Sequence, residues 1–229
     1  GDTLIGGMGG DDLIDYGGYS IFKGMAGNDG LLALNDQGNL AIYRGNLADY
    51  QISLNQSFSI GEHLGLTGLI IQDGIIERDG MDKVANIDRL QFADINLALD
   101  TAKGENAGEA YRIYKAAFDR TPEAEGLSFW INALDRGANL VDVAQGFINS
   151  DEFRVMYGAN PTDQQFVTLL YNHVLHRPPE GEGYQFWLNS LNAGVSRAQV
   201  LKDFSESTEN INQTAELIAN GIQYEAWIG

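Results

Sequence analysis

Aliphatic or aromatic side chains recur every nine residues at the start of the chain, at Leu4, Leu13, Phe22 and Leu31. Glycines gather in the segments between them, where a tight turn requires positive φ angles. A period of nine divides into a six-residue turn and a short strand. This pattern predicts a solenoid of parallel strands, with the apolar side chains stacked in one column between two sheets.

The nonapeptide period fades along the chain. Residues 6–14 follow it fully, with the sequence Gly-Gly-Met-Gly-Gly-Asp-Asp-Leu-Ile, and residues 24–32 depart from it only at Met25. The copies at 15–23 and 33–41 are degenerate. Because the first residues are the tail of a further copy, we expect the chain to be a fragment of a longer protein. The predicted roll, residues 1–41, is therefore short.

The repeats also predict a metal site. Successive turns of such a roll fall on alternate sides, so turns two repeats apart become neighbours, and Asp11 faces Asp29. An all-oxygen cage of two carboxylates and turn carbonyls suits calcium. The candidate backbone ligands are Gly7, Gly9, Met25 and Gly27. Asp2 is a weaker candidate, because the turn that it faces holds Ser20. Without metal the aspartates repel one another, and bound calcium removes that penalty.

These residues resemble the hemolysin-type calcium-binding repeat of RTX proteins, Gly-Gly-x-Gly-x-Asp-x-Leu-x. The resemblance implies a parallel β-roll that folds with Ca²⁺. It also implies export by the type I secretion machinery of a Gram-negative bacterium, and an extracellular or cell-surface location. A flexible Gly/Asp-rich linker is the alternative, but a linker has no reason to keep aliphatic side chains in phase.

Residues 42–103 carry strand signals, with alternating apolar residues at 50–54 and an apolar run at 69–71. The stretch 79–92 resembles the segment that often follows RTX repeats, and we expect it to cap the open end of the roll. Asp79 and Asp82 are further candidate calcium ligands. The alternative is an ordinary turn, since the EF-hand pattern is absent.

The remainder, 104–229, is predicted to be helical and contains a duplication at an offset of 57 residues. Its units cover about 109–157 and 166–214, and each is predicted to form three helices. Matching pairs include Tyr114 with Tyr171, Arg120 with Arg177, Pro122 with Pro179, Trp130 with Trp187, Phe147 with Phe204 and Ser150 with Ser207. This half resembles a helical domain of unknown function that is common in secreted RTX proteins. The C-terminal tail resembles a type I secretion signal.

Side chains in the duplication suggest chemistry as well as packing. The repeated Phe-Trp pairs fit a buried helical stripe, while a sugar-binding or partner-binding surface is the alternative. Arg120 and Arg177 each precede an acidic loop, so we expect intramolecular ion pairs. Helix starts are expected at Thr121-Pro122, and as capping boxes at Thr162 and Ser196. His173 and His176 are weak evidence for zinc without a third ligand.

The charge, composition and motifs of the chain exclude several classes of function. The formal net charge of −18 argues against nucleic acid as a partner, and the absence of cysteine excludes disulfides and thiolate sites. No segment is long and apolar enough to span a membrane. No nucleophile elbow, phosphate loop, zinc helix or dinucleotide motif occurs, so we predict no enzymatic activity.

We therefore expect a multidomain β + α protein: a non-catalytic, calcium-binding terminal region of a secreted protein, with a helical interaction domain. One alternative is an adhesin module that binds a cell-surface glycan or another surface protein. The other is the C-terminal appendage of a larger secreted hydrolase or epimerase.

Overall fold

The computed structural model describes residues 1–34 and 38–225. Within them the chain forms two compact units, one of residues 1–99 with 223–225 and one of residues 100–222. The first is β-rich and the second is helical, which confirms the predicted fold class. Residues 35–37 of the degenerate repeat and residues 226–229 of the predicted tail lie outside the described residues. No helix among those described is long and apolar enough to cross a membrane.

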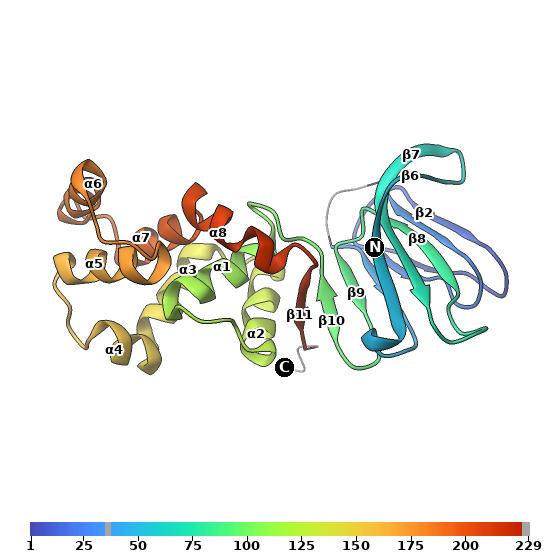
Figure 1. Cartoon of the computed structure of the whole chain (residues 1–229), viewed down its shortest axis with the longest axis horizontal. Coiled ribbons are helices and arrows are strands. Elements are labelled where there is room, and N and C mark those ends of the chain that lie inside the picture. The colour runs from blue at the N-terminus through green and yellow to red at the C-terminus, as the bar shows by residue number, and fades with distance from the viewer. Residues whose placement is uncertain (35–37, 226–229) are drawn as a thin grey trace. The chain divides into compact units, whose positions relative to one another are not determined.

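The β unit contains two sheets (Figure 1). One sheet has the order β1-β3-β5-β9-β10-β11 and the other β2-β4-β8-β7-β6. The strands are β1 (Thr3–Ile5), β2 (Asp12–Asp15), β3 (Ile21–Lys23), β4 (Gly30–Ala33), β5 (Leu40–Ile42), β6 (Tyr50–Ile60), β7 (His63–Asp73), β8 (Met81–Ala85), β9 (Arg89–Gln91), β10 (Asn96–Ala98) and β11 (Ile222–Tyr224).

The nonapeptide strands alternate between the two sheets, as the period predicts. β1 pairs with β3 and β2 pairs with β4, both in parallel and in an 18-residue register. Leu4 therefore lies beside Phe22, and Leu13 beside Leu31. Phe22 and Leu31 are fully buried in the main core of the unit, whereas Leu4 and Leu13 are only partly buried. The apolar column of a short β-roll is thus formed.

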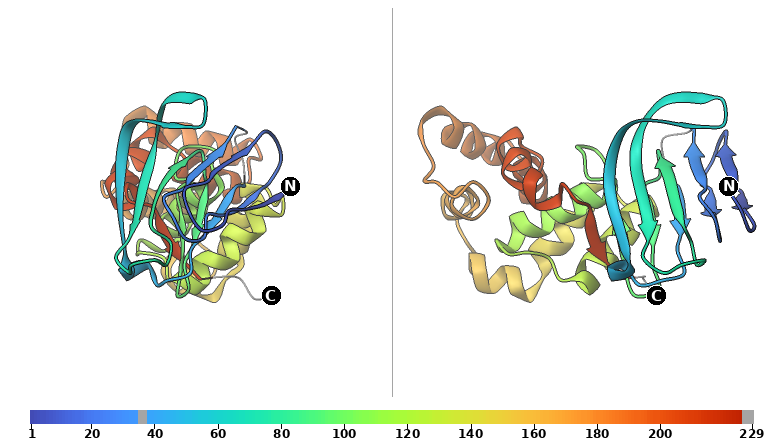
Figure 2. Two further views of the ribbon diagram at one scale, coloured as in Figure 1. Left: turned by 90° about the vertical axis from the view of Figure 1, so that its right-hand side faces the viewer. Right: turned by 45° about the vertical axis from the view of Figure 1, so that its right-hand side comes forward.

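A long hairpin interrupts the roll. The chain leaves after β5, forms the antiparallel pair β6–β7, and re-enters at β8, which pairs in parallel with β4. β9 then pairs in parallel with β5. Residues 79–92, predicted to be a cap, therefore supply two more strands of the roll itself. The hairpin arches over the unit (Figure 2), and its Phe58 and Ile60 bury Leu32 on the outer face of the second sheet.

The helical unit consists of two sets of four helices. The first set is α1 (Asn106–Phe118), α2 (Ala124–Asp135), α3 (Leu140–Asn149) and α4 (Asp151–Tyr157). The second is α5 (Asp163–Val174), α6 (Gly181–Asn192), α7 (Arg197–Ser205) and α8 (Thr208–Ile218). The prediction of three helices in each unit was wrong. Ser150 and Ser207, both in extended conformation, are the N-caps of α4 and α8 and split the expected last helix of each unit into two.

Most of the predicted local features of the duplication are present. Thr162 and Gln165 form the expected capping box, and Ser196 accepts a hydrogen bond from the Gln199 backbone N–H. The helix expected to start at Thr121-Pro122 begins later, because its N-cap is Glu123.

The repeated aromatic pairs divide between core and surface. Trp130 lies against the buried Phe147 with ring centroids 4.6 Å apart, and Trp187 lies against Phe204 at 5.0 Å. The neighbouring Phe129 and Phe186 are exposed instead, at 44% and 60%. The tryptophans thus pack on buried side chains but are themselves only half-buried, so the core interpretation holds for them in part. It fails for the phenylalanines, because adjacent residues of a helix point in different directions.

Candidate metal-binding site

Three aspartates stack in a column along one side of the roll, and we call Asp11, Asp29 and Asp82 the acidic column. The Asp11 backbone N–H donates to Asp29 Oδ1 at 2.9 Å, and the Asp29 backbone N–H donates to Asp82 Oδ1 at 2.9 Å. The carboxylates of Asp29 and Asp82 thus each accept a hydrogen bond from the turn stacked on them. The predicted proximity of Asp11 and Asp29 is present, and Asp82 extends the column across a gap of 53 residues.

Close approach of the turn backbones explains the glycines of this column. A Cβ atom on Gly27 would lie 2.0 Å from the carbonyl oxygen of Gly9, and one on Gly80 would lie 1.6 Å from that of Gly27. Both glycines also have positive φ angles, 146° and 78°. Glycine is therefore required at both positions, because a side chain would force the stacked turns apart.

The other side of the roll carries a matching column that is mostly neutral. Here the backbone N–H of Asp2 donates to Ser20 Oγ, that of Ser20 donates to Asn39 Oδ1, and that of Asn39 donates to Asp88 Oδ2. The distances are 3.1, 3.2 and 2.9 Å. We call this set the neutral column, because its two central side chains are uncharged. The weak candidate Asp2 lies at its exposed end.

The acidic column concentrates negative charge where water is excluded. Asp29 is 1% exposed, and its Oδ2 atom is buried without a hydrogen-bond partner. Burial raises the pKa of Asp29, the hydrogen bond from Asp11 lowers it, and the nearby charges of Asp11 and Asp12 raise it further. Asp82 is equally buried, and desolvation and the charge of Asp29 raise its pKa to about 8. A buried carboxyl group of this kind is satisfied by a cation, by a hydrogen-bond donor or by retaining its own proton.

The predicted backbone ligands lie in the stacked turns of the acidic column. The Gly7 backbone N–H donates to Asp11 Oδ2 at 2.7 Å, and the Gly7 carbonyl accepts from the Ala26 N–H at 3.2 Å. Met25 has a φ angle of 76°, a conformation that side chains rarely adopt. The carbonyl groups and carboxylates of these turns come from two repeats. All of these candidate metal ligands are oxygen atoms, the ligand type that calcium prefers.

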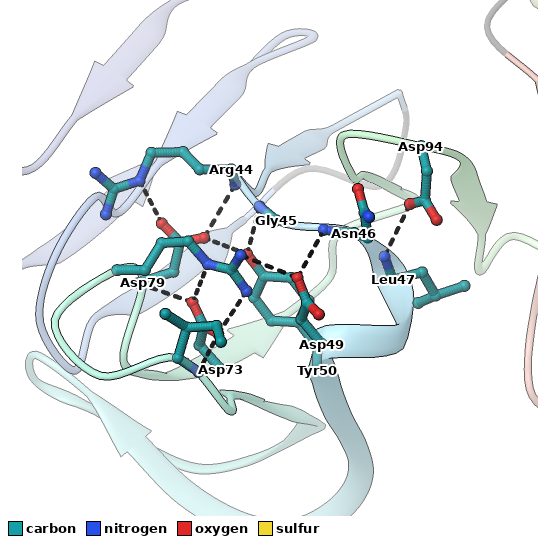
Figure 3. A network of polar contacts seen from close by, with 11 residues as sticks. Arg44, Gly45, Asn46, Leu47, Asp49, Tyr50, Asp73, Asp79 and Asp94 are labelled. Carbon is teal, nitrogen blue, oxygen red and sulfur yellow. Dashed lines mark hydrogen bonds and ion pairs between the residues drawn. The ribbon is translucent and has the colours of Figure 1, made fainter.

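Asp79 lies in a different polar network, at the base of the hairpin (Figure 3). Its Oδ1 accepts from Arg44 Nε at 2.6 Å, and its Oδ2 accepts from the Arg44 backbone N–H at 3.0 Å and from the Tyr50 hydroxyl. Arg78 pairs with Asp73 at 2.7 Å in the same network. Both oxygens of Asp79 are therefore engaged in holding the hairpin, whereas Asp82 faces the acidic column.

The stacking of Asp82 on Asp29 was not predicted from the sequence. The signal was nevertheless present, because Gly-x-Asp-x-aliphatic occurs at Gly9–Leu13, at Gly27–Leu31 and again at Gly80–Val84. Among the described residues, no cluster of three or more His, Asp or Glu side chains has the arrangement of a metal site. A site of the predicted type instead uses two carboxylates and completes its coordination with backbone carbonyls.

Arg120 and Arg177 pair with acidic side chains, as expected. Arg120 contacts Glu123 at 3.2 Å and Glu152 at 2.9 Å. At the equivalent positions 57 residues later, Arg177 contacts Glu180 at 3.2 Å and Glu209 at 2.7 Å. The histidines show no shared ligand set. Burial lowers the pKa of His173, and the His176 Nε2 atom lies 3.6 Å from Asp119.

The architecture is thus a β-roll with a hairpin insertion, together with a duplicated four-helix unit. Residues 105–156 and 144–214 match a protein family described as a domain of unknown function (DUF4214). These two overlapping matches agree with the duplication. They confirm the expected resemblance of the helical half, but they do not extend to the nonapeptide segment. No curated protein and no solved structure matches the chain.

Proposed function

We propose that the β unit binds calcium at the acidic column, and that calcium binding stabilises the stacked turns of the roll. The observation that carries this proposal is the buried Asp29 carboxylate, whose Oδ2 atom has no hydrogen-bond partner. Asp11 lies on one side of it and Asp82 on the other.

Comparison of the two columns supports a cation rather than simple packing. Both columns hold their turns by the same hydrogen bonds from backbone N–H to side chain. The neutral column achieves this with Ser20 and Asn39, so carboxylates are not needed for turn stacking. The acidic column has three buried or partly buried carboxyl groups instead, and ionising them together in a low-dielectric interior is disfavoured, as the raised pKa values of Asp29 and Asp82 reflect. A divalent cation would offset that penalty.

The wider role follows from the nonapeptide resemblance. We propose that the chain is the non-catalytic terminal region of an RTX-type protein that leaves a Gram-negative cell by type I secretion. The low calcium of the cytosol would leave the acidic column repulsive, and the higher calcium outside the cell would favour the folded roll. The helical unit would then serve as an interaction domain at the cell surface or in the medium.

Calcium titration of the metal-free protein tests the proposal. Isothermal titration calorimetry of the unchanged chain should show calcium binding, and the Asp11→Ala/Asp29→Ala variant should lose it. Asp151→Ala is a matched control, because that side chain is 95% exposed and lies on α4. Circular dichroism of each variant establishes whether it is folded.

The control variant is expected to bind calcium with unchanged stoichiometry. Equal stoichiometry in the folded double variant would show that the acidic column is not the site. Absence of calcium binding by the unchanged chain would overturn the proposed function.

A further inference from the structure

The helical unit contains a cavity of about 620 Å³ where α4 meets α5. It is lined by Tyr157 at the end of α4, by residues 158–161, and by Gln164, Gln165, Thr168 and Leu169 of α5. None of these residues is charged, in a protein with a net charge of −18. An uncharged hollow of this size, with a few amide and hydroxyl groups, is suited to an apolar occupant with hydrogen-bonding edges.

The duplication shows what occupies the equivalent surface in the first repeat. Leu169 corresponds to Arg112 at the offset of 57 residues. Arg112 is 1% exposed, and helices α7 and α8 pack against the helix that carries it. Its guanidinium group donates to both carboxylate oxygens of Glu206, at 2.7 and 2.9 Å, and to the Thr101 carbonyl at 2.9 Å. The end of α7 therefore closes this face of α1.

The cover in the second repeat is smaller within the described residues. The Tyr184 hydroxyl of α6 lies 3.4 Å from the Thr168 hydroxyl, and Arg197 of α7 donates to the Pro161 carbonyl at 2.7 Å. The helix equivalent to α7 is α3, which packs against α1 and α7 and has no comparable packing against α5. Leu169 and Thr168 are consequently only half-buried, while Gln164 and Gln165 are exposed. One repeat thus has a helix seated on its first helix, and the other has a cavity at the corresponding place.

We propose that this cavity is the docking site of an amphipathic helix from a partner protein, seated on α5 as α7 is seated on α1. Where α7 presents Glu206 to Arg112, the partner helix presents an aliphatic side chain to Leu169. The buried residues of α7 are Ala198, Val200, Leu201, Phe204 and Ser205, so the partner helix is expected to carry a mainly apolar stripe of the same kind. Its polar edges would meet the amides of α5.

Synthetic copies of α7 and α8 provide the probe. Two labelled peptides of residues 196–218 are compared, one with Glu206 and one with Glu206→Leu, by fluorescence anisotropy on the full chain. The leucine peptide should bind at least about tenfold more tightly, because the other peptide leaves a carboxylate unpaired against Leu169. Amide NMR shifts should fall on residues 164–169.

A substitution that introduces a charge at residue 169 of the protein provides a second test. Leu169→Arg recreates the residue of the first repeat and should reverse the preference, so that the peptide with Glu206 binds better. Val155→Arg is the matched control, because Val155 lies on α4 and is 87% exposed, and this variant should keep the preference for leucine. Failure of both peptides to bind overturns the proposal. So do shifts confined to α1, or an unchanged preference in the Leu169→Arg variant.

Discussion

The Asp29→Asn variant replaces the central carboxylate of the acidic column by an amide, the group that Asn39 supplies in the neutral column. The amide keeps Oδ1, which accepts the hydrogen bond from the Asp11 N–H, and replaces the unpartnered Oδ2 by a donor. The neutral column shows that an amide is tolerated in such a turn. Asn39 is fully buried there, accepts from the Ser20 N–H, and directs its amide nitrogen to the Asn86 carbonyl at 3.5 Å.

Asp29→Asn is expected to raise the free energy of unfolding without calcium and to reduce the stabilisation that calcium gives. In chelator, Asp29→Asn removes a carboxylate whose charge is disfavoured by burial and by the charges of Asp11 and Asp12, an effect of about 1–3 kcal/mol. The variant should therefore unfold at a higher urea concentration than the unchanged protein. With free calcium at about 100 times the dissociation constant, the unchanged protein should gain about 2.7 kcal/mol. The variant should gain much less, because it has lost the central carboxylate of the column.

The assay is urea unfolding followed by far-ultraviolet circular dichroism, in chelator and in calcium. The reciprocal control is Asn39→Asp, which places a buried carboxylate in the neutral column and should destabilise the calcium-free protein by a similar amount. The tryptophans at 130 and 187 lie in the helical unit, so in a Trp227→Phe background their fluorescence reports its unfolding separately. An Asp29→Asn variant that is less stable in chelator, and gains as much from calcium as the unchanged protein, would refute the reasoning.

Two further predictions concern buried ionisable groups. In calcium-free solution, the raised pKa of Asp82, about 8, means that the folded protein retains a proton which the unfolded chain releases near pH 4, so the free energy of unfolding should fall from about pH 4 to pH 8. Urea midpoints across that range check this, and Asp82→Asn should flatten the decline. Arg112→Ala leaves Glu206 buried without its partner and should lower the stability of the helical unit by about 3–5 kcal/mol. Scanning calorimetry should show a loss of about 1 kcal/mol or less for the more exposed pair in Arg120→Ala, and equal losses would contradict the assignment.

The nonapeptide pattern was sufficient to predict the roll, because both the strand period and the apolar column are local properties of the sequence. It could not reveal where the roll continues. β8 and β9 rejoin the roll after a long hairpin, and their pairing with β4 and β5 is specified by contacts between residues about 50 positions apart. For this reason the sequence predicts a cap at residues 79–92, although Gly80, Asp82 and Val84 repeat the end of the nonapeptide motif.

The candidate site could also be predicted only in part from the sequence. Asp11 and Asp29 follow from the repeat spacing, but the role of Asp79 does not, because its partners Arg44 and Tyr50 come from a turn that the hairpin brings back. In the helical half, the offset of 57 residues indicated equivalent positions and the ion pairs of Arg120 and Arg177. It gave no indication of the Arg112–Glu206 pair, because neither residue is repeated at the equivalent position.

That difference separates two kinds of interaction in the duplication. The contacts of Arg120 with Glu123 and Glu152 recur in the second repeat with nearly the same distances, so they stabilise each repeat by itself. The Arg112–Glu206 pair joins the repeats and occurs once. The residues of the pair inside each repeat are thus the same in both copies, while those of the pair that joins the repeats are not. A divergent surface without an internal partner, as at Leu169, is where binding to another protein can be altered without destabilising either repeat.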